Sequence, residues 1–207
     1  VGNILMLERD EELEKKADSV IDLIAKAQEE DGYLDTYFSI EEPDKKWTDV
    51  LECHELYCAG HFIESAVAYY KATGKEKIIQ VAYKLADYLD TVFGPEEGKI
   101  HGYPGHQEIE IALIRLYDLS GNEKYLKLAG YFINTRGTNR FFEEEFEKRD
   151  HISFWAKART EDPNQYYNQY PYSYYNQFQS PVREQKKAVG HAVRGVYMYT
   201  AMADLAA

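Results

Sequence analysis

A helical repeat with a period of 47 residues constrains the fold of this chain more than any other feature of its sequence. The stretch 73–77, Thr-Gly-Lys-Glu-Lys, matches the stretch 120–124, Ser-Gly-Asn-Glu-Lys, and an alanine follows each copy at the same distance. Glycine is the usual left-handed residue after a helix, so Gly74 and Gly121 each separate two helices. A helix-turn-helix unit of this length is typical of stacked helical hairpins.

Hydrophobic periodicity supports the same architecture along most of the chain. Apolar residues recur at helical spacing, and no alternating run is long enough to indicate a sheet. We therefore expect an all-α chain, with helices over about 8–28, 49–72, 75–93, 106–119, 122–136, 141–146 and 187–207.

The expected helices differ in character. Those over 49–72, 106–119 and 187–207 contain few lysines and are apolar around much of their circumference, which indicates burial on several sides. Those over 75–93 and 122–136 are amphipathic and contain lysines, as in an outer layer. This alternation favours hairpins that form part of an (α/α)n toroid. Three hairpins do not close such a ring, so we expect residues 1–207 to be one partial barrel domain of a longer protein.

The segment 148–187 departs from this regularity. It contains a Tyr/Asn/Gln-rich run over 166–175 and reads as an irregular, Tyr-rich insertion within the domain. Connections of this length are usually functional or disordered. An aromatic lid over a polar ligand and a surface insertion are both open interpretations.

Charge and cysteine content exclude several classes of protein. The net charge is −12, with 24 Lys and Arg against 36 Asp and Glu, which disfavours binding to nucleic acid or to an anionic membrane. No apolar run approaches the roughly 20 residues of a transmembrane helix. Cys53 and Cys58 are expected on one helix, too far around it for a disulfide. Reduced thiols suit a cytoplasmic location, although a targeting segment is not excluded because the sequence lacks an initiator methionine.

Histidines recur where these helices begin. Gly-His occurs at 60–61, 105–106 and 190–191, and each pair precedes an apolar, Tyr-bearing segment. Helices that enter a toroid from one rim would direct His54, His106 and His191 into one cavity, so we expect these three side chains to share a pocket. The alternative is that each is a packed, hydrogen-bonded core histidine.

Two chemical interpretations follow from these residue types. His54, Cys58 and His61 have i, i+4, i+7 spacing, which fits a zinc site as well as it fits ordinary packed helix residues. Neutral histidines, carboxylates and many tyrosines make a surface that reads hydroxyl groups, which indicates a sugar. Five glutamates are candidates for a glycosidase acid pair, and the sequence ranks none of them: Glu52, Glu55, Glu64, Glu108 and Glu110.

Four ordered motifs resemble a known family. They are Asp-Gly-Tyr-Leu-Asp-Thr-Tyr at 31–37, His-Glu-Leu-Tyr-Cys-Ala-Gly-His at 54–61, Tyr-Pro-Gly-His-Gln-Glu-Ile-Glu at 103–110, and Pro-Val-Arg-Glu-Gln at 181–185 followed by Ala-Val-Gly-His-Ala-Val-Arg at 188–194. Together they resemble glycoside hydrolase family 127, the β-L-arabinofuranosidase-like enzymes with an (α/α)6 catalytic barrel. The resemblance implies that His54, His106 and His191 contact the arabinofuranose, with Tyr33, Glu55 and Tyr103 as further pocket residues.

The resemblance also implies which parts of the enzyme lie outside this chain. The family's zinc-bound cysteine nucleophile and its acid/base glutamate belong to the second half of the barrel, and Cys53 and Cys58 match no part of that cluster. We therefore expect no catalytic residue, metal or cofactor in this chain, with zinc in the missing half.

The resemblance thus implies the N-terminal half of a retaining glycosidase with a carbohydrate substrate, inactive alone. Exposed inner helices would allow a homo-oligomer or another form of self-association. Two alternatives stay open. One is a sugar isomerase or epimerase of the same toroid type, in which two histidines act as general acid and base. The other is a non-catalytic helical-repeat binding module.

Overall fold

The computed structural model describes residues 1–150 and 172–207, and this part of the chain is all-α, with one isolated bridge between Phe93 and Ile100. None of its helices has the length and apolarity needed to cross a membrane. The elements are α1 (Gly2–Leu7), α2 (Glu11–Ala27), α3 (Thr36–Ile40), the 3-10 turn η1 (Pro43–Lys45), α4 (Glu55–Thr73), α5 (Glu76–Val92), α6 (Ile109–Ser120), α7 (Glu123–Thr135), α8 (Phe141–Lys148), α11 (Tyr172–Tyr175), the 3-10 turn η2 (Val182–Glu184) and α12 (Ala192–Ala206).

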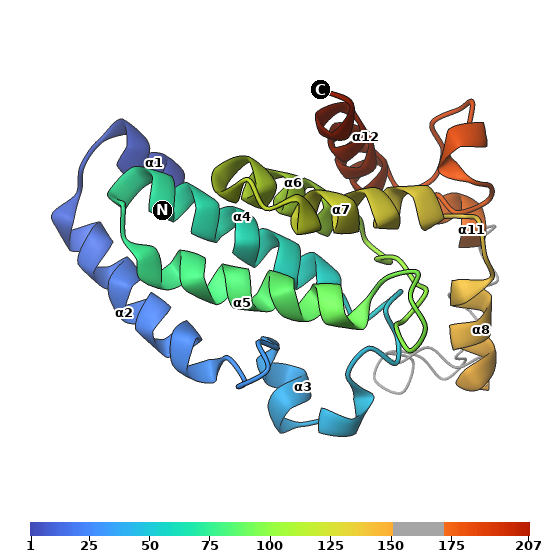
Figure 1. Ribbon diagram of the computed structural model, residues 1–207, viewed down its shortest axis with the longest axis horizontal. Helices are drawn as coiled ribbons and strands as arrows, with labels where there is room; N and C mark the ends of the chain where they lie inside the picture. Colours follow the sequence, from blue (N-terminus) through green and yellow to red (C-terminus); the bar gives the residue numbers. More distant parts are fainter. Residues whose placement is uncertain (151–171) are drawn as a thin grey trace.

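The helices form the two layers that the repeat predicted. The inner helices α4, α6 and α12 pack in succession, while α5 covers α4 and α7 covers α6 (Figure 1). Gly74 and Gly121 end the inner helices α4 and α6 with φ of 72° and 68°, the left-handed conformation that glycine adopts without strain. The all-α prediction and the hairpin prediction are therefore confirmed.

The outer helices are amphipathic because one face of each packs on an inner helix. On α5, Ile78, Ala82, Leu85 and Leu89 are buried, while lysines on the same helix face outward. Lys77 of α5 pairs with Asp22 of α2 at 2.5 Å, so α2 lies against the outer helix rather than in the inner layer. The lysine content of each helix thus reports its layer.

The inner helices begin later than their apolar pattern predicted. The expected starts at 49, 106 and 187 are wrong, since α4, α6 and α12 begin at Glu55, Ile109 and Ala192. His54 has a φ of 60°, so the helical conformation cannot continue N-terminally through it. Cys53 consequently lies before α4 rather than on the same helix as Cys58.

The Tyr-rich segment is tested only in part. Residues 151–171, which contain half of the Tyr/Asn/Gln run, lie outside the described residues, so the choice between lid and surface insertion stays open. The described remainder of 148–187 contains α11 and η2 joined by irregular backbone.

Two of the loops that precede inner helices meet in backbone contact at Gly105. Its amide donates to the carbonyl of Val50 at 3.3 Å, and a Cβ at this position would lie 2.0 Å from the carbonyl oxygen of Leu51. Any side chain at 105 would therefore force the loop 49–54 away from the loop 102–108.

We expect Gly105→Ala to lower the free energy of unfolding by about 1–3 kcal/mol, because the new methyl group overlaps backbone atoms that have no room to move. Chemical denaturation followed by circular dichroism measures this change. Gly130→Ala is the matched control, since the nearest atom to its Cβ would be 3.8 Å away and alanine favours a helix. Equal effects of the two substitutions would contradict the prediction.

Candidate functional site

The three predicted histidines lie together. The ring centroids of His54 and His106 are 5.9 Å apart, and those of His106 and His191 are 5.8 Å apart. His106 is the central ring and lies on the loop before α6, whereas His54 precedes α4 and His191 precedes α12. The structure therefore brings the three side chains into one group, which we call the histidine cluster. Contact of this cluster with a sugar stays a prediction.

Local hydrogen bonds fix how Nδ1 of each ring is used. Nδ1 of His54 donates to the carbonyl of Glu52, and Nδ1 of His106 donates to the carbonyl of Gln107 at 2.8 Å. Nδ1 of His191 instead accepts from the amide of Arg194 at 3.4 Å, because His191 is the N-cap of α12. In the neutral form, Nε2 of His106 is thus an acceptor and Nε2 of His191 an N–H donor.

Burial keeps two of these rings uncharged. It lowers the pKa of His106 to about 4, opposed by the hydrogen bond to the Gln107 carbonyl and reinforced by the positive charge of Arg194. Burial and the same arginine also lower the pKa of His191. At neutral pH, His106 and His191 are therefore neutral hydrogen-bonding groups rather than cations.

Tyrosine rings surround the histidine cluster. Tyr57 lies 4.4 Å from His106, Tyr197 lies 5.9 Å from His106, and Tyr175 lies 5.4 Å from His191 (centroid distances). Tyr57, Tyr197 and Tyr175 are not among the site residues predicted from the sequence. Tyr57 lies inside the motif at 54–61, and Tyr197 lies one turn from Arg194 on α12, so proximity to the motifs was the available signal.

A fully buried arginine supports the loops behind the rings. Nη1 of Arg136 donates to the carbonyl of Asn176 at 3.1 Å, Nη2 donates to the carbonyl of Pro104, and the guanidinium lies 5.0 Å from the centroid of the Tyr103 ring. Arg194 donates to the carbonyl of Gly105 at 3.4 Å. These contacts join the loop that contains His106 to the end of α7, to Asn176 and to α12.

Gln177 fixes the backbone that precedes α12. Its side-chain amide donates to the carbonyls of Val189 and His191 at 2.8 and 3.0 Å, and its own backbone has a φ of 54°. Gln107 donates to Oε1 of Gln177 at 3.3 Å, so the loops of His106 and His191 also share a side-chain contact.

The other three predicted pocket residues are buried. Tyr33 and Glu55 are 1% and 3% exposed, and Tyr103 is fully buried. The hydroxyl of Tyr33 donates to Oε1 of Glu55 at 2.6 Å, and the amide of Trp47 donates to Oε2 at 3.0 Å. Desolvation raises the pKa of Glu55 to about 7 against these two hydrogen bonds. These three side chains are buried, and their contact with a sugar stays a prediction.

The zinc interpretation of His54, Cys58 and His61 is wrong. His54 precedes α4 in a left-handed conformation, so the three residues do not form a helical stripe. Within the described residues, the three His, Cys, Asp or Glu side chains close enough to share a metal ion are instead His61, Glu64 and Glu108.

The two cysteines do not fit the zinc-bound nucleophile that the resemblance implies. Both thiols are free, and Cys53 packs with Tyr33 and Phe38. Desolvation, followed by nearby carboxylates, raises the pKa of each thiol, which disfavours the thiolate that zinc requires.

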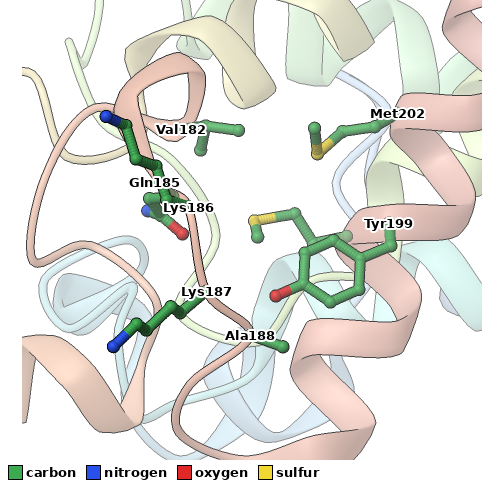
Figure 2. A pocket seen from close by; sticks show the side chains of 8 residues that line it. Val182, Gln185, Lys186, Lys187, Ala188, Tyr199 and Met202 are labelled. Carbon is green, nitrogen blue, oxygen red and sulfur yellow. The ribbon is translucent and has the colours of Figure 1, made fainter.

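A separate hollow of about 170 Å³ lies between the segment 182–188 and α12 (Figure 2). The ring of Tyr199 faces it from α12, and the amino group of Lys187 points away from it. None of the residues that line it belongs to the histidine cluster.

Alternating inner and outer helices, with a histidine cluster on the loops before the inner ones, define part of an (α/α) barrel catalytic domain. The model of the β-L-arabinofuranosidase GH127 catalytic domain matches residues 1–207. The chain therefore belongs to glycoside hydrolase family 127.

Characterised relatives agree with this assignment. A non-reducing end β-L-arabinofuranosidase from Bifidobacterium longum subsp. longum is 42% identical over 203 residues, which are 95% of this chain and 29% of that protein. The crystal structure of a GH127 β-L-arabinofuranosidase from Geobacillus stearothermophilus T6 matches with 53% identity and a TM-score of 0.87, covering 99% of this chain and 31% of that one. The GH127 β-arabinofuranosidase BT3674 matches with 37% identity and a TM-score of 0.80, covering 99% and 29%. The chain thus spans under a third of the length of these relatives.

We expect His106 to make the folded chain sensitive to acid. The folded state binds the histidine proton near pH 4, whereas an unfolded histidine binds it near pH 6.5, so stability falls as the pH decreases through this window. His106→Asn removes that loss, which amounts to about 3 kcal/mol between pH 7 and pH 4. Urea denaturation at several pH values measures it. His101→Asn, at an exposed position, is the control, and parallel pH profiles for the chain and His106→Asn would contradict the prediction.

Proposed function

We propose that the complete protein hydrolyses β-L-arabinofuranosides and that this chain supplies sugar-binding side chains, with His54, His106 and His191 as the principal contacts. The observation that carries the proposal is the histidine cluster, in which three rings from separate loops lie within 5.9 Å of their neighbours.

The protonation pattern supports a hydroxyl-rich ligand. A sugar hydroxyl donates one hydrogen bond and accepts others, so it can donate to Nε2 of His106 and accept from Nε2 of His191. Because burial keeps His106 and His191 uncharged, these contacts do not favour an anionic ligand over a neutral sugar. Tyr57 and Tyr197 add aromatic surface next to His106, as sugar-binding sites commonly use.

The names of the relatives supply the reaction and the sugar. Two of them are β-L-arabinofuranosidases, and the share of their length that this chain covers is about 30%. The activity therefore belongs, in this proposal, to the complete protein. We assign no catalytic residue to this chain, because the family resemblance implies that the nucleophile and the acid/base glutamate belong to the second half of the barrel.

The same protonation pattern argues against the isomerase alternative. An acid and base pair of histidines needs one ring that holds a proton at neutral pH. The low pKa of His106 and the lowered pKa of His191 disfavour an imidazolium acid at either position.

The test is hydrolysis of an aryl β-L-arabinofuranoside by the complete protein. We expect His106→Asn and His191→Asn each to lower kcat/KM roughly tenfold or more, because each loses a hydrogen bond to the sugar. His101→Asn is the matched control and should retain full activity, since His101 is exposed and outside the cluster. The 207-residue chain alone should show no turnover.

Three results would contradict the proposal. They are unchanged kcat/KM in both cluster variants with intact circular dichroism, hydrolysis by the chain alone, and absence of activity of the complete protein on L-arabinofuranosides. Isotope exchange between a free sugar and solvent, lost in His106→Asn, would favour the isomerase instead.

A further inference from the structure

Glu108 is a fully buried carboxyl group that meets only two polar side chains of α4, His61 and Glu64, among the described residues. Its side chain packs against α4 at Gly60, where a Cβ would lie 1.6 Å from Oε2 of Glu108. A buried carboxyl group next to a second carboxyl group needs a ligand or a proton between the two.

The side chains that face Glu108 are those that bind metals. His61 and Glu64 are three residues apart on α4 and therefore lie on one face of the helix. One ligand atom from each of His61, Glu64 and Glu108 lies within 4.8 Å of the other two. Nδ1 of His61 is 3.4 Å from Oε1 of Glu108. Two ligands of one tetrahedral zinc ion, with bonds of about 2.1 Å, are separated by about 3.4 Å.

Arg115 is the cation that lies beside the group. Its Nη1 is 2.7 Å from Oε1 of Glu64. Glu108, the N-cap of α6, is fully buried next to this pair, and its Oε1 lies 3.4 Å from Nδ1 of His61. Two carboxyl groups thus face one guanidinium and one imidazole.

We propose that His61, Glu64 and Glu108 form a binding site for a divalent transition-metal ion of the Zn²⁺ class. One imidazole and two carboxylates provide three protein ligands, and together with the guanidinium of Arg115 the group has a net charge of −1 before an ion binds. His61 and Glu64 also line a groove of about 550 Å³ between α4 and the helices α1 and α2, so the remaining coordination position faces solvent. The inference does not depend on the proposed glycosidase activity.

The site would also be linked to the histidine cluster through one ring. The centroid of His61 lies 4.4 Å from that of Tyr57, and Tyr57 lies 4.4 Å from His106. A metal ion that fixes the imidazole of His61 would therefore fix the ring against which Tyr57 packs.

The experiment measures bound metal directly. The purified, metal-stripped protein is dialysed against Zn²⁺ and, separately, against Co²⁺, and the bound metal is counted by elemental analysis and by the visible absorption of Co²⁺. We expect His61→Gln and Glu64→Gln each to bind one equivalent less than the unchanged protein, or to bind it at least tenfold more weakly. His101→Gln, which alters an exposed histidine outside the site, should bind as the unchanged protein does.

Circular dichroism of every variant separates loss of the site from loss of the fold. His61 is the most exposed of the three ligands, so His61→Gln decides the question if Glu64→Gln does not fold. Equal metal content in the unchanged protein and in folded His61→Gln would overturn the proposal. Absence of Zn²⁺ and Co²⁺ binding by the folded protein would also overturn it. A proton shared between Glu64 and Glu108 would then explain why these two carboxyl groups lie next to each other.

Discussion

The buried guanidinium of Arg136 is the interaction on which the arrangement of the histidine loops depends. Its removal from water costs several kcal/mol, and burial lowers its pKa to about 10, so it stays charged at neutral pH. The carbonyls of Pro104 and Asn176 accept from it, the face of Tyr103 covers it, and Glu110 lies 4.0 Å away. One charge therefore ties the loop of His106 to the segment that leads to α12. Loss of the guanidinium would remove the donor to these two carbonyls and the positive charge next to Glu110, whose Oε2 would keep the amide of Glu108.

The architecture was predictable because it repeats. Two hairpins with the same glycine turn bury the same faces, so their periodicity reports the inner and outer layers without any tertiary information. The grouping of His54, His106 and His191 followed from that regularity. The starts of the inner helices did not, because tertiary contacts set them. The amide of Val50 donates to the distant Glu145, and buried Asp49 pairs with Arg149, so residues with helical periodicity form a loop instead.

The chemistry of individual carboxyl groups was not predictable for the same reason. The sequence does not distinguish five glutamates that differ in burial in the structure: Glu52, Glu55, Glu64, Glu108 and Glu110. Glu55 is held by the hydroxyl of Tyr33, and Glu108 occupies space that Gly60 leaves in another helix. Each determinant lies tens of residues away along the chain, where no local pattern connects the two. In the sequence, Arg136 is likewise an ordinary basic residue at the end of an amphipathic helix. The carbonyls to which it donates are identified only in the structure.

The two ends of each hairpin have different freedom to change. The ends that carry the histidines are tied by buried polar contacts, whereas a Cβ at Gly74 or Gly121, at the opposite ends of α4 and α6, would meet no atom within 4 Å. Loop tips with such open surroundings tolerate inserted sequence. A peptide tag or a fluorophore attachment site could therefore be placed at either turn to immobilise or label the protein. The end that carries the histidine cluster would stay unobstructed.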